Sequence, residues 1–268
     1  MKKAINHLQP YCGIPQLRWD IDCLSRKPGI RDYLSKKASS RAYPTRLLRY
    51  WFIYHFLRVE RERRSQPLRV CEVGIDVGQM LRFTSSAGDP RKPIWSSWDG
   101  VDYRLQTDRI ADAGYTSLTQ SDVEQSLDWL SADHDVIIFL HVLEHLRDPE
   151  KLFRDMTPRL KPGAVIVGGF PSVPHFCISR RERQLREHTN DNGHITAFSV
   201  KRTRTIAAAC RLQLDFITGA FLLRASGLSL ENYSWWFRFN LAFGSFVPGW
   251  PGELYWVMRK SGEESAII

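Results

Sequence analysis

The sequence predicts an α/β fold: a doubly wound, mostly parallel sheet with an antiparallel edge strand, preceded by a helical N-terminal extension. After Pro67, short apolar runs alternate with helix-like segments, which is the pattern of parallel strands joined by crossover helices. Two further strand-like runs, before residue 224 and before residue 261, would form the antiparallel edge. The chain of 268 residues is 43% hydrophobic, enough to bury one sizeable core. We therefore expect one α/β domain over residues 67–268 and an extension over residues 1–66.

The extension is strongly basic. Residues 1–66 carry 15 Lys and Arg against 5 Asp and Glu, whereas the rest of the chain carries 23 against 24. The positive charge of this segment could attract nucleic acid, anionic lipid or an acidic partner. The same residues could equally form a solvated helix face. Thr45 is expected to cap a helix that packs on the following domain through an apolar stripe. The stripe consists of Leu47, Leu48, Trp51, Phe52, Phe56 and Val59.

The α/β domain is expected to contain four parallel strands that alternate with helices. We place the strands at 69–73, 94–101, 135–140 and 164–168. The helices are expected near 78–85, 106–113, 148–160 and 199–211, the last with Ser199 as its cap. The runs assigned to the antiparallel pair are 214–223 and 252–260.

Composition narrows the function classes. Five widely spaced cysteines without a CxxC pair indicate neither a disulfide framework nor a zinc knuckle. No apolar run reaches the roughly 18 residues that a membrane-spanning helix needs, and the opening residues lack a secretory signal. We therefore expect a cytoplasmic protein.

The aromatic segment 232–250 could lie against the inner face of a membrane, line an acceptor pocket or pack in the core.

A glycine-containing turn follows the first expected strand. It reads Glu72-x-Gly74-x-Asp76-x-Gly78. Glycines there let the backbone turn tightly and approach a ligand, and the helix that follows offers free N–H groups. Asp102 ends the next strand 24 residues after Gly78, near the roughly 20-residue spacing at which an acid meets ribose hydroxyls. Together these features predict a nucleotide site on a Rossmann-like sheet.

The turn resembles the first motif of the class I S-adenosylmethionine-dependent methyltransferases, acid-x-Gly-x-Gly-x-Gly, with Asp76 in the place of the middle glycine. If the backbone there needs a positive φ, Asp is among the few residues besides glycine that tolerate it. The resemblance extends over about 100 residues. Its most specific part, "HDVIIFLHVLEHLRDPEKLFRDMTPRLKPGAVIVGGFPS", matches the fourth strand, active-site turn, helix, "LKPG" turn and fifth strand of that family.

The resemblance implies S-adenosylmethionine as cofactor and assigns a role to several residues. Glu72 would engage the methionine amino end, and the loop with Gly74, Asp76 and Gly78 would approach the cofactor. Further along the chain, the ribose would be bound by Asp102 beside Tyr103, the adenine amino group by Asp122 beside Val123, and the cofactor lined by backbone at Leu140.

The "HVLEH" segment offers candidate catalytic groups: His141, Glu144 and His145. The same spacing occurs in inverted zinc peptidases, but those need both histidines inside a helix, and His141 directly follows a strand. His141 or His145 could act as a general base toward a substrate hydroxyl. Alternatively the three residues and His194, from an expected substrate-recognition insert at 171–199, could hold a divalent ion, as in the metal-using quinone and small-RNA O-methyltransferases that this turn resembles. A third reading is that Glu144 and His145 only fix the turn.

The predicted function is O-methylation of a small molecule, a glycan or a lipid-linked acceptor, with peripheral membrane contact as one option. A candidate histidine base favours a hydroxyl acceptor. One alternative is a binding protein that has lost methyltransferase activity, because the charge and bulk of Asp76 could weaken cofactor binding. The other alternative is an RNA ribose O-methyltransferase. Nucleic acid is not expected as a partner, because the chain has no recognisable RNA-binding module. The sequence leaves the oligomeric state open.

Overall fold

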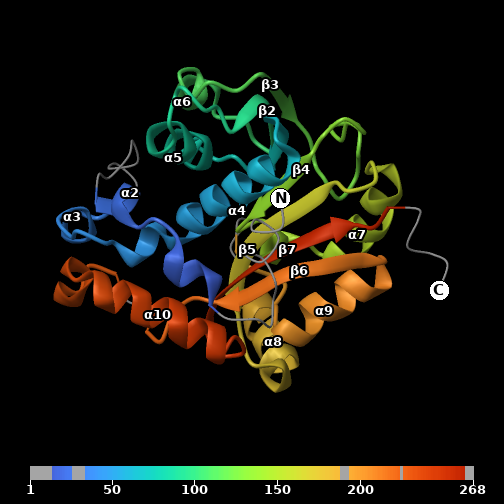
Figure 1. Ribbon diagram of the computed structural model, residues 1–268. Coiled ribbons are helices and arrows are strands. Elements are labelled where there is room, and N and C mark those ends of the chain that lie inside the picture. Colours follow the sequence, from blue (N-terminus) through green and yellow to red (C-terminus); the bar gives the residue numbers. More distant parts are fainter. Residues whose placement is uncertain (1–13, 26–33, 188–192, 224–225, 263–268) are drawn as a thin grey trace.

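The computed structural model describes residues 14–25, 34–187, 193–223 and 226–262. Its centre is a seven-stranded sheet in the order β3-β2-β1-β4-β5-β7-β6 (Figure 1). The strands are β1 (Leu68–Val73), β2 (Trp95–Asp102), β3 (Ser117–Gln120), β4 (Val136–Leu140), β5 (Val165–Ser172), β6 (Leu212–Gly219) and β7 (Gly252–Lys260). β7 runs antiparallel to both of its neighbours, and the pairs from β3 through β5 are parallel. This confirms the predicted doubly wound, Rossmann-like sheet and its antiparallel pair.

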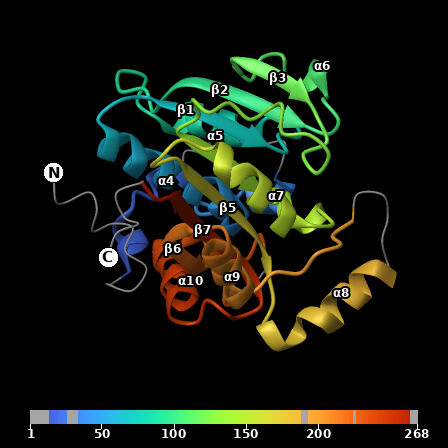
Figure 2. The same cartoon turned by 90° about the vertical axis from the view of Figure 1, so that its right-hand side faces the viewer.

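Helices cover both faces of the sheet (Figure 2). One face buries α4 (Leu48–Arg64), α5 (Gln79–Ala87) and α10 (Ser234–Phe246), and the other buries α7 (Pro149–Met156) and α9 (Val200–Ala209). Shorter or peripheral helices are α2 (Asp22–Ser25), α3 (Lys36–Ser39), α6 (Thr107–Ile110) and α8 (Ile178–Glu187). Because side chains alternate along a strand, β7 sends Tyr255 and Val257 into the first core and Leu254 and Trp256 into the second.

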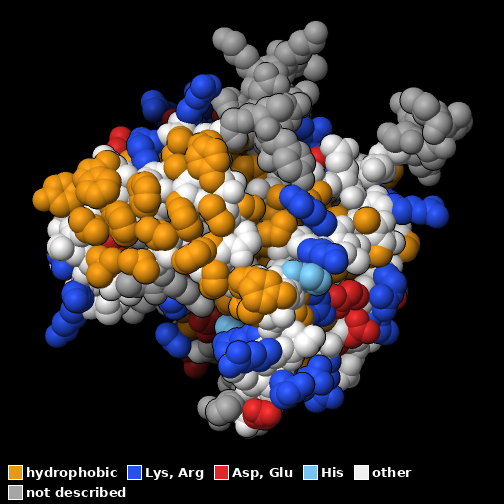
Figure 3. Space-filling model, turned by 90° about the horizontal axis from the view of Figure 1, so that it is seen from below, with side chains coloured by type: hydrophobic (Ala, Val, Ile, Leu, Met, Phe, Trp, Pro, Cys, Tyr) orange, Lys and Arg blue, Asp and Glu red, His pale blue; other side chains and the backbone are white. Residues whose placement is uncertain are grey.

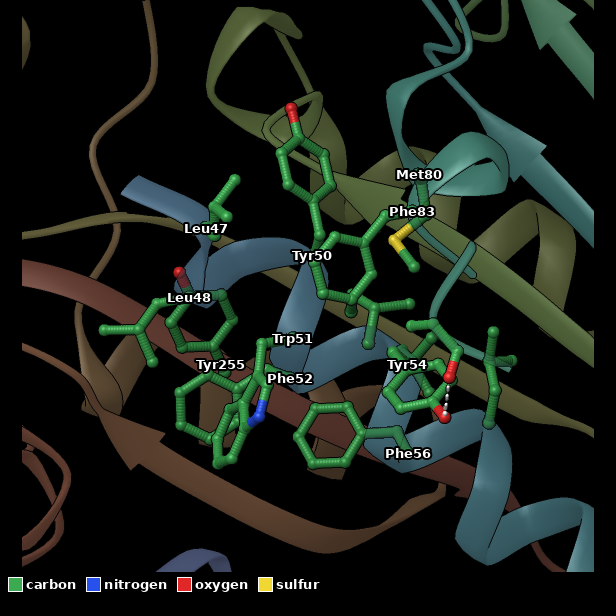
Figure 4. Close-up of a cluster of buried hydrophobic side chains, with 14 of the residues drawn as sticks. Leu47, Leu48, Tyr50, Trp51, Phe52, Tyr54, Phe56, Met80, Phe83 and Tyr255 are labelled. Carbon is green, nitrogen blue, oxygen red and sulfur yellow. Dashed lines mark hydrogen bonds between the residues drawn. The ribbon is translucent and has the colours of Figure 1, made fainter. Parts of the chain in front are cut away.

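The N-terminal helix α4 is part of the core (Figure 4). All six residues of the predicted stripe are buried, which confirms that this helix packs on the domain that follows. The Phe52 ring stacks on Tyr255 with centroids 4.3 Å apart, and the Tyr54 hydroxyl donates to the Ala87 carbonyl at 3.0 Å. Whether residue 66 is a domain boundary stays a prediction.

The predicted cap of this helix is wrong. Thr45 begins a separate 3-10 turn, η3 (Thr45–Leu47), and its hydroxyl donates to Glu231 at 2.8 Å instead of capping α4. By contrast, Ser199 does cap α9, because its hydroxyl accepts from the Arg202 N–H at 3.2 Å. The Ser199 hydroxyl lies 3.1 Å from His175 Nδ1 as well, but that contact leaves its oxygen able to accept from the helix backbone.

Several element boundaries differ from the prediction. The helix expected at 106–113 shrinks to the four residues of α6, and the helix expected at 148–160 ends at Met156 before a 3-10 turn. The sequence did not predict β3 or α10 as regular elements. β3 has four residues, all exposed, so it carries no apolar alternation. Within the described residues, no helix is long and apolar enough to cross a membrane.

Candidate active site

The carboxyl ends of β2, β1 and β4 meet at one edge of the sheet. Val73, at the end of β1, pairs with Val101 on one side and Phe139 on the other. Gly74, Asp102 and Leu140 therefore follow at the same level. This is the switch point at which the order of the strands reverses, and open α/β sheets bind their ligands in the crevice there.

The glycine-containing loop after β1 has three left-handed residues. The φ angles are +74° at Gly74, +47° at Asp76 and +76° at Gly78. The conditional prediction for Asp76 is thus confirmed: the middle position does need a positive φ, and Asp adopts it. Gly74 is further constrained, because an added Cβ would lie 2.3 Å from Cγ2 of Val142. Only glycine lets this loop touch the turn that follows β4.

Hydrogen bonds to that loop connect two acidic residues, Asp102 and Asp76. The Asp102 side chain accepts from the Asp76 N–H at 3.0 Å and from the Arg104 N–H at 2.9 Å. The Asp76 carboxylate in turn accepts from the side-chain amides of Gln79 and Gln106, at 3.1 and 2.8 Å. These two donors stabilise the charge of the acid that replaces the middle glycine.

Glu72 lies deeper, on the α4 side of the sheet. Its Oε2 accepts from Trp98 Nε1 at 2.9 Å and from the Tyr115 hydroxyl at 3.1 Å. Burial raises the pKa of Glu72 to about 8, so the carboxyl is protonated at neutral pH. Sequence reasoning missed both donors. The expected contact of Glu72 with the methionine amino end stays a prediction.

The other predicted cofactor residues lie along the same edge. Tyr103, next to Asp102, is exposed, and Asp122 and Val123 follow β3, whose Gln120 pairs with Asp102. Asp122 accepts from the Glu124 N–H and the Gln125 amide, at 3.0 and 2.8 Å, while Val123 is buried. A left-handed glycine loop with acids after the next two strands fits an adenosine-containing cofactor with an amino-acid tail.

His141 stands between two buried carboxylates. It directly follows β4 with a φ of +58°, and its Nδ1 lies 3.0 Å from Glu144 Oε1 and its Nε2 3.6 Å from Glu253 Oε1. The Nδ1 contact is an ion pair and not a hydrogen bond, because neither side-chain oxygen of Glu144 has a partner with hydrogen-bond geometry. Glu253, on β7, also pairs with Arg49 of α4 at 2.8 Å and accepts from the Tyr255 hydroxyl.

The charges of this network set the protonation of His141. Burial lowers the pKa of His141, but Glu253 and Glu144 outweigh it and raise the pKa above its ordinary value. Burial raises the pKa of each carboxyl as well, yet the cations hold the pKa of Glu144 low and that of Glu253 well below its usual range. The two carboxylates therefore favour the protonated form of His141, which makes it a weaker candidate for a general base than a free imidazole.

Sequence reasoning missed Arg49, Glu253 and Tyr255. Two signals were available: Glu253 is the only acid in the strand-like run 252–260, and Arg49 interrupts the apolar stripe of α4. A lone charge in an apolar run often marks a buried pair.

A second cluster lies on the solvent side of Glu144. His145 ends the 3-10 turn η4 (Leu143–His145), and its Nδ1 lies 3.2 Å from the Gly193 carbonyl. The His145 and His194 rings meet edge-on at 4.8 Å, and His194 Nε2 lies 3.9 Å from Glu144 Oε1. Ligand atoms of all three residues lie within 4.8 Å of one another, so the cluster could hold a divalent cation. The structure thus brings Glu144, His145 and His194 together, and it places His141 between Glu144 and Glu253.

The sheet order, the left-handed glycine loop at the switch point and the acids after β2 and β3 define a Rossmann-like fold with a site for a nucleotide-containing cofactor. Residues 42–212 match the family described as "Methyltransferase domain", and the chain belongs to that family. It is a class I S-adenosylmethionine-dependent methyltransferase, and S-adenosylmethionine is its cofactor. The predicted family and cofactor are confirmed, whereas the small-molecule branch stays a prediction.

Solved structures share this fold at low identity. A provisionally assigned sarcosine dimethylglycine methyltransferase from Galdieria sulphuraria has a TM-score of 0.55 and 16% identity, over 79% of this chain and 86% of that one. A chain from the complex of the Haloferax volcanii Trm112 methyltransferase activator with a provisionally assigned methyltransferase has a TM-score of 0.53 and 16% identity, over 78% and 90%. The plantazolicin methyltransferase BamL, solved with a substrate analog and SAH, has a TM-score of 0.52 and 14% identity, over 80% and 85%. A search of curated proteins returned no match.

Proposed function

We propose that this methyltransferase acts on a hydroxyl of a small molecule, a glycan or a lipid-linked acceptor, with His145 as the general base. The observation that carries the proposal is the hydrogen bond from His145 Nδ1 to the Gly193 carbonyl. A carbonyl can only accept, so Nδ1 keeps its proton and the lone pair of the neutral ring lies on Nε2. That nitrogen is free to take a proton from an acceptor hydroxyl.

The surrounding residues support this assignment. Val142, three residues before His145, packs against Gly74 of the cofactor loop, so the base and the cofactor site share one turn. The bound cofactor would supply an electrophilic methyl group. Glu144 carries a negative charge beside His194 and would stabilise the imidazolium formed at the cluster, and His141 would position Glu144. Holding the hydroxyl in line with the methyl supplies much of the barrier reduction.

A second candidate mechanism uses a divalent cation held by Glu144, His145 and His194. It is favoured by the donor set itself and by the two oxygens of buried Glu144, which lack aligned hydrogen bonds. A cation there would polarise the acceptor hydroxyl directly. His141 lies outside this set, because its two ring nitrogens face Glu144 and Glu253.

The test is a screen of hydroxyl acceptors, RNA ribose included, with methyl-labelled S-adenosylmethionine and mass detection of one added methyl group. With an acceptor in hand, we expect His145→Gln to lower the rate about 10²–10⁴-fold while cofactor affinity by calorimetry stays unchanged.

Three results would distinguish the two mechanisms and test the assignment of a hydroxyl acceptor. An unchanged rate of methyl transfer in His145→Gln would remove His145 as the base. Loss of activity on chelation, restored by a divalent ion, would favour the metal mechanism. Methyl transfer to carbon or nitrogen acceptors alone would contradict the hydroxyl assignment.

A further inference from the structure

The helix α10 is apolar on two opposite sides although it lies at the surface. Trp236, Phe237 and Leu241 point inward and are buried against the sheet core. On the other side, at helical spacing, Trp235 is 56% exposed and Phe246 is 75% exposed. A helix with apolar side chains on all sides is normally buried, so the outer side of α10 lacks the apolar surroundings that such a helix usually has.

The exposed side continues beyond the helix. We name it the aromatic face, and it consists of Tyr233, Trp235, Phe239, Phe246, Val247 and Trp250. Figure 3 shows apolar side chains gathered over one half of this side of the molecule, with Lys and Arg side chains around its rim and over the other half. Apolar patches of this extent mark interaction sites.

The segment that carries the aromatic face exposes no carboxylate. This segment, 228–251, contains one acid, Glu231, which is fully buried, and one cation, Arg238, which donates inward to the Leu17 carbonyl. Exposed Lys36 and Lys37 lie on α3, and the Lys37 stem packs next to Gly227, just before the segment. A face of Trp, Tyr and Phe with cations at its rim and no exposed carboxylate matches the headgroup region of an anionic bilayer.

The aromatic face adjoins the catalytic edge of the sheet. Val247 and Trp250 lie in the segment that leads from α10 into β7, and Glu253, the second residue of β7, is the residue that contacts His141. Trp250 is tied to the end of the neighbouring strand segment by a 3.0 Å bond from its indole N–H to the Leu222 carbonyl. A partner surface that contacts the aromatic face would therefore hold its own molecules close to the edge of the sheet where the candidate active site lies.

We infer that the aromatic face docks the protein on a membrane surface that contains anionic phospholipid, so that the acceptor is taken from that surface. A second copy of the chain is the less suitable occupant, because a symmetric contact would bring the cations of both rims together. The inference builds on the lipid-linked acceptor of the proposed function, yet its test requires neither cofactor nor acceptor.

The test is co-sedimentation of the full chain with vesicles of phosphatidylglycerol and phosphatidylcholine, compared with phosphatidylcholine alone. We expect binding to the anionic vesicles that weakens with salt. Trp235→Ser/Phe239→Ser should weaken it about tenfold or more, since each removes a ring from the interface. Lys36→Glu/Lys37→Glu should weaken binding to the anionic vesicles only.

The matched control is Leu118→Ser, an exposed apolar residue on β3 at the far edge of the sheet. It should bind vesicles like the unaltered chain, and circular dichroism should show all variants folded. No vesicle binding by the unaltered chain, or equal binding by the Trp235→Ser/Phe239→Ser variant, would overturn the inference. So would a stable dimer that this variant dissociates. Methyl transfer to a water-soluble acceptor would leave the vesicle result unaffected.

Discussion

At the scale of single residues, the backbone of the cofactor loop was more predictable than the partners of its side chains. The motif predicted that Asp76 would tolerate a positive φ if the loop required one, and its φ is +47°. Nothing in the motif indicated that Gln79 and Gln106 would bind its carboxylate, because one of those residues lies 30 positions away. Local steric rules act through neighbouring residues, whereas partners depend on the whole fold.

Glu72 gives a pH-dependence at this scale. The unfolded chain releases the Glu72 proton near pH 4.5, and the folded protein holds it until about pH 8. The folded state therefore binds more protons between these values, and its free energy of unfolding should fall as pH rises through them, by an amount on the order of a few kcal/mol.

Glu72→Gln mimics the protonated carboxyl and can still accept from Trp98 and Tyr115. Urea unfolding at pH 5 and pH 8 should show a smaller loss of stability in this variant than in the unaltered protein. Glu62→Gln, at an exposed site on α4, serves as the control and should keep the full loss. Equal losses in Glu72→Gln and the unaltered chain would mean that Glu72 ionises normally.

At the scale of elements, those with a clear apolar period or a buried run were predicted, and those without one were missed. The strand at 252–260 was placed at its observed bounds, because a long apolar run between Gly252 and two polar residues has clear ends. α10 was missed because it is apolar on both sides and so shows no helical period. The predicted site residues lie at the carboxyl ends of the strands, whereas the contact of β7 with His141 depends on a strand pairing that no local pattern reveals.

The docking of α10 depends on a contact between backbones. A Cβ added to Gly244 would lie 2.2 Å from the Gly219 carbonyl oxygen and 2.6 Å from the Ala220 nitrogen, and a backbone cannot give way as a flexible side chain can. We expect Gly244→Ala to destabilise the protein by about 1–3 kcal/mol through overpacking. Gly249→Ala is the matched control, since no atom lies within 4 Å of its added Cβ. Thermal unfolding of the two variants measures the difference, and equal midpoints would show that α10 can shift without cost.

At the scale of the whole molecule, one ionic network joins the first long helix, the active-site turn and the last strand. Arg49, His141 and Glu253 come from α4, the end of β4 and β7, and all three are largely removed from water. A buried carboxylate that loses its cation keeps the cost of desolvation without the attraction.

Arg49→Met should therefore lower the free energy of unfolding by about 3–5 kcal/mol. The double variant Arg49→Met/Glu253→Gln should recover part of that loss, because the unpaired charge is removed. Arg58→Met, on the same helix with a weak exposed pair at 4.0 Å, should change stability little. Denaturant titration of the three variants measures this, and a loss below about 1 kcal/mol in Arg49→Met would show that water reaches Glu253.

The place of β7 between β5 and β6 also constrains how the protein forms during translation. β5 and β6 leave the ribosome well before residues 252–260, and each needs that late segment as its hydrogen-bonding neighbour. Until it arrives, the nascent chain presents one unpaired edge of β5 and both edges of β6, which are sites for pairing with other chains. Chaperones that shield such edges should therefore matter most before residues 252–260 have left the ribosome.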